Sequence, residues 1–81
     1  MQIHIRLSGV LASNIGKPRL TLVLPDETTV AELRDLLCQK YPDSASKLHT
    51  AVPITTGRHV SLSEKLVDGQ EVAFLMPIAG G

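Results

Sequence analysis

The sequence has only one cysteine among its 81 residues, Cys38. A single cysteine can form neither an internal disulfide nor a thiolate zinc cage, so a disulfide scaffold and a zinc finger are both excluded. A near absence of cysteine is also typical of reducing compartments. We therefore expect a cytoplasmic domain that is held together by packing.

Aromatic residues are scarce, and neither sign of charge is in excess. Tyr41 and Phe74 are the only aromatics, and eight Lys and Arg balance eight Asp and Glu. Nucleic-acid binding needs a clustered cationic surface or aromatic side chains on which bases stack. The composition therefore predicts no nucleic-acid partner.

Long hydrophobic runs are absent too. No apolar run approaches the roughly 18 residues of a membrane span, and the amino end alternates instead of forming a secretory segment. We therefore expect no membrane association and no export by this route. The 43% of hydrophobic residues suffice for the core of one small domain.

Apolar and polar residues alternate in two early segments, residues 1–8 and 19–24. A period of two predicts strands with one buried face. The turn-compatible residues between them, in 9–18, predict a long loop that joins the two strands into a hairpin.

A helix is predicted to begin at Val30. Thr29 and Glu32 have the spacing of a capping box, in which each side chain satisfies a free amide of the first turn. Apolar residues then recur at helical spacing for about 12 residues, until Pro42 disfavours helical geometry at the residue before it. The members of this apolar stripe are Val30, Leu33, Leu36, Leu37 and Tyr41.

The second half of the chain predicts shorter elements. Residues 43–48 resemble a short turn of helix, and residues 50–55 and 58–61 resemble brief strands. Pro53 cannot donate a ladder hydrogen bond, which indicates an edge position or a bulge. After a turn, residues 71–76 alternate again as a last strand.

This order of elements predicts an α+β fold, a β-grasp (ubiquitin-like) roll in which a mixed sheet packs on one main helix. One amphipathic helix needs one sheet face to cover its stripe. We expect the domain to occupy residues 1–76, with its last strand parallel to the first. Residues 77–81 are then a flexible tail that leaves the domain.

The tail ends in Gly80 and Gly81. An enzyme that activates an α-carboxylate must draw it into a narrow channel, where glycine avoids collisions and Pro77 stiffens the base. A chain end can also simply fray, in which case the protein is an inert interaction domain.

The chain resembles the ubiquitin-like sulfur carriers, most closely the small subunit of molybdopterin synthase. The resemblance rests on the opening strand, "DETTVAELRDLL" at 26–37, "DGQEVAF" at 68–74 and the Gly-Gly end. It implies that an E1-like enzyme adenylates Gly81 with ATP and magnesium. It also implies that a sulfur donor protein then supplies the sulfur of a thiocarboxylate, which is offered inside a larger synthase subunit.

Such a protein is a carrier and cosubstrate, not an enzyme, and binds no permanent cofactor. Two alternatives remain open. The carrier could serve thiamin, cysteine or tRNA thiolation, or it could be a ubiquitin-like modifier whose activated Gly81 forms isopeptide bonds with lysines.

Leu75 is expected to point away from the helix, because its neighbours Phe74 and Met76 take the core positions. With Ala73 it forms a partner-binding patch beside the tail, unless it is ordinary scattered surface. The tail itself consists of Pro77, Ile78, Ala79, Gly80 and Gly81.

Other reactive residues have structural interpretations. Cys38 lies within the helix without a group that would stabilise a thiolate, so it is expected to be inert. No metal site is predicted, because His4, His49 and His59 lie on separate elements. Four carboxylates near the helix start are expected to complement its dipole: Asp26, Glu27, Glu32 and Asp35.

Overall fold

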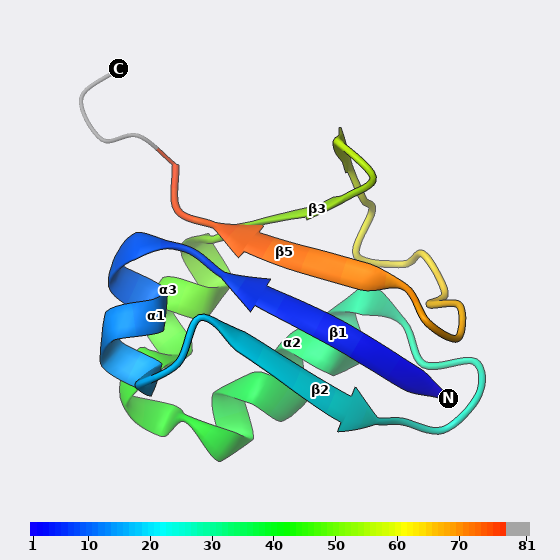
Figure 1. The fold of residues 1–81 in the computed structure, drawn as a ribbon, viewed down its shortest axis with the longest axis horizontal. Helices are drawn as coiled ribbons and strands as arrows, with labels where there is room; N and C mark the ends of the chain where they lie inside the picture. Colours follow the sequence, from blue (N-terminus) through cyan, green and yellow to red (C-terminus); the bar gives the residue numbers. More distant parts are fainter. Residues whose placement is uncertain (78–81) are drawn as a thin grey trace.

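The computed structural model describes residues 1–77. Its elements are β1 (Gln2–Leu7), α1 (Gly9–Ile15), β2 (Arg19–Val23), α2 (Val30–Lys40), η1 (Pro42–Ser44), α3 (Ala45–Thr50), β3 (Val52–Thr55), β4 (Arg58–His59) and β5 (Glu71–Leu75). Figure 1 shows α2 and α3 behind one face of the sheet and α1 beside the end of β1. No helix within residues 1–77 has the length and apolarity that a membrane crossing requires.

The five strands form one mixed sheet in the order β2-β1-β5-β3-β4. The first and last strands are parallel, whereas the other neighbours are antiparallel. The predicted α+β architecture, a mixed sheet packed on one main helix, is confirmed. Because β5 lies between β1 and β3, the segment after β5 leaves from the centre of the sheet.

The core lies between the inner face of the sheet and α2. The inward side chains of β1 and β5 are almost fully buried, and so are Val30, Leu33 and Leu37 of the predicted stripe. Burial of each large apolar side chain contributes about 1.5 to 3 kcal/mol. The alternating apolar residues of the strands and the apolar stripe of α2 therefore pack against each other in one core.

The capping box at the start of α2 is also confirmed. The Glu32 amide donates to Thr29 Oγ1 at 3.2 Å, and the Thr29 amide donates to Glu32 Oε1 at 2.9 Å. Two amides of the first turn are satisfied in this way. The helix begins at Val30 as predicted and ends one residue before Tyr41.

The long loop predicted for residues 9–18 is wrong, because Gly9–Ile15 form α1. Leu11 is completely buried, so its contact with the core stabilises a short helix that has little intrinsic tendency to form. Gly16 ends the helix with φ at 95°, and its amide donates to the Ala12 carbonyl at 2.9 Å. The hairpin pairing of β1 with β2 is confirmed.

Of the two alternatives for Pro53, an edge position or a bulge, the edge position is not observed, since β3 lies between β5 and β4. The Pro53 carbonyl accepts the Val60 amide at 3.2 Å. The amide and carbonyl of a strand residue point to the same side, so the missing donor of Pro53 faces away from β5. Only Ile54 and Thr55 pair with β4 there, which lets the sheet tolerate the proline.

Candidate functional site

The carboxyl end of β5, which precedes the tail, is tied to the residue that follows β1. Ser8 follows β1, and both its amide and its hydroxyl reach the Phe74 carbonyl at 3.4 Å. Pro77 follows β5 and is exposed. Ile78, Ala79, Gly80 and Gly81, which were predicted to carry the chemistry, lie outside the described residues.

The two faces of β5 differ in surroundings. Val72 and Phe74 are fully buried against the helices. Ala73 and Leu75 point to the opposite face, where both are half-buried. Leu75 therefore points away from α2, as predicted.

The strand register adds two residues to this face. Val52 lies opposite Leu75, and Ile54 lies opposite Ala73. Residues directly opposite each other in a sheet share a face, so all four side chains point outward. We call Val52, Ile54, Ala73 and Leu75 the outer patch. All four are half-buried apolar residues at the base of the tail.

The sequence interpretation missed Val52 and Ile54. The sequence pattern that could have identified them is their position two residues apart in β3, which places both on one face of the strand, while Pro53 between them lies opposite the inward Phe74. That spacing identifies a strand face, but it does not say which strand lies next to it. The pairing of β3 with β5 is what brings these residues to the tail.

Cys38 lies on α2 and is half-buried. Its Sγ is 3.8 Å from the Ala45 carbonyl oxygen. Burial raises the pKa of the thiol, although nearby Arg34 opposes this shift. The thiol therefore stays protonated at neutral pH and is a poor nucleophile, in line with its predicted structural role.

The histidines and carboxylates have separate surroundings. His4, His49 and His59 are all exposed, and residues 1–77 contain no cluster of three or more potential metal ligands. Among the acids near α2, Glu32 makes the cap, whereas two others pair with cations instead of the helix end. Glu27 forms an ion pair with Lys65 that lowers the pKa of the Glu27 carboxyl, and Asp26 lies 3.9 Å from the Met1 amino group.

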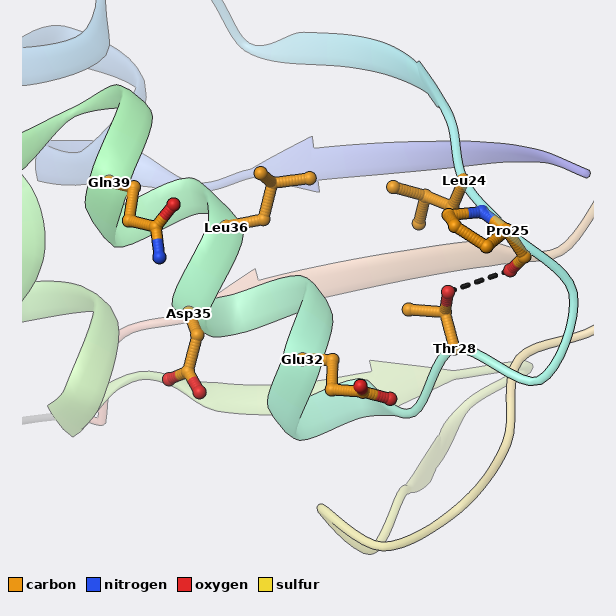
Figure 2. A pocket seen from close by; sticks show the side chains of 7 residues that line it. All are labelled: Leu24, Pro25, Thr28, Glu32, Asp35, Leu36 and Gln39. Carbon is orange, nitrogen blue, oxygen red and sulfur yellow. Dashed lines mark hydrogen bonds between the residues drawn. The ribbon is translucent and has the colours of Figure 1, made fainter.

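A pocket of about 300 Å³ lies beside α2, lined by residues of that helix from Glu32 to Gln39, at the end of the sheet away from the tail. Figure 2 shows Leu24 and Leu36 pointing toward each other across its opening, with Glu32 near the rim. Thr28 Oγ1 donates to the Pro25 carbonyl at 2.7 Å and holds the adjoining loop. This pocket was not predicted, and its position separates it from the outer patch.

Comparison with solved structures shows the same fold. SAMP1 from Haloferax volcanii has a TM-score of 0.87 at 21% identity and covers all of both chains. The putative molybdopterin converting factor subunit 1 from Pyrococcus furiosus has a TM-score of 0.87 at 17% identity, over 96% of this chain and 99% of that one.

In a complex of subunits 1 and 2 of molybdopterin-converting factor from Helicobacter pylori, the matching chain has a TM-score of 0.71 at 23% identity over all of both chains. No curated protein matches this sequence. The sequence profile of the ThiS family, however, matches residues 5–81. A match over nearly the whole chain shows that this protein belongs to the ThiS family of ubiquitin-like sulfur carriers.

Proposed function

We propose that this protein carries sulfur as a thiocarboxylate on Gly81 and donates it in molybdopterin synthesis. The observation that carries the proposal is the ThiS family match, which extends through the terminal Gly80-Gly81. The five residues from Pro77 to Gly81 reach at most about 18 Å, at roughly 3.3 to 3.6 Å each. That reach lets the carboxylate enter a partner's active site while the folded domain stays outside.

In the proposed reaction, the Gly81 carboxylate attacks the α-phosphate of ATP, and pyrophosphate leaves. The terminal sulfur of a persulfide on the donor protein then attacks the acyl-adenylate carbonyl, and AMP leaves. A thiol next attacks the donor-side sulfur of this acyl disulfide, which releases the Gly81 thiocarboxylate and leaves a disulfide on the donor. An E1-like enzyme supplies the magnesium and the catalytic groups for the adenylation. Glycine suits this passage because it lacks the β-carbon that would crowd a narrow channel.

The outer patch is the proposed docking surface for the activating enzyme and for a larger synthase subunit. Contiguous apolar area on a small domain commonly marks a protein interface. The Helicobacter pylori relative was solved as a complex of subunits 1 and 2 of molybdopterin-converting factor, which supports a heteromeric synthase here.

A second candidate function is protein modification. A relative with the same fold over its whole length is SAMP1, the small archaeal modifier protein 1 of Haloferax volcanii. The chemistry is shared up to the acyl-adenylate. A lysine amine then attacks in place of sulfur, and an isopeptide bond forms at Gly81.

Intact-mass measurement tests the proposal. The protein is incubated with its activating enzyme, ATP, magnesium and a sulfur source, and we expect the mass change of one oxygen replaced by sulfur. Lysine-linked conjugates without that change would favour the modifier. Unchanged protein would contradict both functions.

Two variants test whether the tail must enter a narrow channel. An alanine appended after Gly81 moves the carboxylate one residue deeper, and Gly81→Val keeps the length but adds a β-branched side chain. Both should lose adenylation, measured as pyrophosphate release, while remaining folded. Parental rates in both variants would show that the tail is not threaded into a channel.

A further inference from the structure

One row of outward residues crosses all five strands beside the tail. Arg19 of β2 lies opposite Arg6 of β1, and Arg6 lies opposite Ala73 of β5. Ala73 in turn lies opposite Ile54 of β3, which lies opposite His59 of β4. We call these five residues the central row. At roughly 4.8 Å between neighbouring strands, the row is about 19 Å long.

The row has a cationic end and an apolar centre. Ala73 and Ile54 belong to the outer patch, and the two arginines lie directly beside them. Leu75, two residues after Ala73 in β5, lies opposite Val52, two residues before Ile54 in β3, and these two form the next apolar pair toward the tail. A protein that covers the patch therefore also contacts the arginines.

Arg6 and Arg19 are an unfavourable pair in the isolated domain. Like charges directly opposite each other on neighbouring strands destabilise a sheet. A guanidinium nitrogen of Arg6 lies 3.6 Å from Glu71 Oε1, so one cation has a partner. Within residues 1–77, Arg19 has no carboxylate within 4.0 Å. The face thus keeps one exposed cation uncompensated.

We propose that the protein docking on this face presents an apolar centre with carboxylates beside it, placed to pair with Arg19 and Arg6. Guanidinium groups bind carboxylates through two parallel hydrogen bonds, which fix orientation as well as charge. A carboxylate from the partner also relieves the repulsion between the two arginines. This inference rests on the proposed function, because it assigns the chemistry of the partner that receives the tail.

A protein fits this face better than a nucleic acid does. The central row contains no Phe, Tyr or Trp side chain on which a base could stack, and its middle is apolar. The phosphate backbone of a nucleic acid would leave Ala73 and Ile54 without a partner. A partner protein with an apolar surface and an acidic rim is complementary both to the apolar middle of the central row and to its two arginines.

Charge reversal at Arg19 tests the inference. Arg19→Glu should weaken binding to the activating enzyme and to the larger synthase subunit by about tenfold at low salt, with a smaller effect at high salt. Lys40→Glu makes the same charge change on α2, behind the sheet, and should bind like the parent. Equal losses in both variants, or parental binding by folded Arg19→Glu, would overturn the inference.

Stability supplies a second readout. Arg19→Gln removes the like-charge pair, so the isolated domain should resist urea at least as well as the parent although it binds partners more weakly. A large loss of stability would instead mean that Arg19 supports the fold. Binding of a single-stranded oligothymidine by the parent, lost in Arg19→Glu, would also overturn the protein assignment.

The two proposals can fail separately. If thiocarboxylate forms and Arg19→Glu still binds like the parent, only the inference on partner charge is wrong. If the parent never forms thiocarboxylate but binds its partners through Arg19, only the proposed chemistry is wrong. In the adenylation assay, Arg19→Glu should raise KM and leave kcat unchanged, since Arg19 lies on the docking face and not in the tail.

Discussion

Cys38 shows how surroundings decide the chemistry of a single residue. Its thiol is half-buried in α2, and desolvation by burial raises its pKa. A raised pKa means that the folded protein holds less thiolate than the unfolded chain at any given pH near the thiol pKa. The thiol of Cys38, the one cysteine of this protein, is therefore poorly suited to carry transferable sulfur.

We predict that Cys38→Ser forms thiocarboxylate at nearly the parental rate. In the parent, iodoacetamide should alkylate Cys38 more slowly in the folded protein than in urea, because the thiolate is the reactive form. Intact mass measures both reactions. Loss of sulfur transfer in a folded Cys38→Ser protein would move the chemistry from Gly81 to the thiol.

At the scale of elements, α2 begins where the capping box predicts. Its start is held both by that capping box and by hydrogen bonds to a distant segment of the chain. The capping box satisfies its first amides. In addition, the Val30 amide donates to the Glu64 carbonyl at 3.0 Å, and the Leu66 amide donates to the Thr28 carbonyl at 2.8 Å. The helix start is thereby tied to the segment that precedes β5.

We predict that Thr29→Ala lowers the free energy of unfolding by about 1 kcal/mol, because the Glu32 amide loses its acceptor. The measurement is urea denaturation followed by circular dichroism. Glu32→Gln is the matched control, since glutamine also serves in a capping box and should cost less. An unchanged urea midpoint for Thr29→Ala would mean that tertiary packing alone fixes the helix start.

At the scale of the whole molecule, the parallel pairing of β1 with β5 brings together parts of the chain that are far apart in sequence. It places Arg6 beside Ala73, and the pairing of β5 with β3 adds Ile54. Docking surface and tail are therefore built on the same central strand. A partner that docks on the outer patch, as proposed, would meet the chain where Pro77 follows this strand.

We predict that Leu75→Glu weakens partner binding at least tenfold, because it places a carboxylate in the apolar patch. Val23→Glu is a matched control: Val23 is 81% exposed and lies on β2, away from the tail. Calorimetric titration with the activating enzyme measures both variants. Equal affinity of the parent and folded Leu75→Glu would leave the tail as the whole recognition element.

The sequence alone determined the elements whose signals are local. Alternation in residues 1–8 and the capping box at Thr29 predict β1 and α2, because each depends on neighbours within a few residues. Resemblance in the sequence also pointed to the family and to Gly81. These are features that one stretch of chain carries by itself.

Only the tertiary structure decided α1 and the docking face. Residues 9–15 contain Gly9 and Asn14, which predict turns, and they form a helix because Leu11 is buried in the core. The outer patch and the central row depend on strand register, which joins residues up to 67 positions apart, such as His4 and Glu71. Register is set by the packing of the whole core, so no local pattern can contain it.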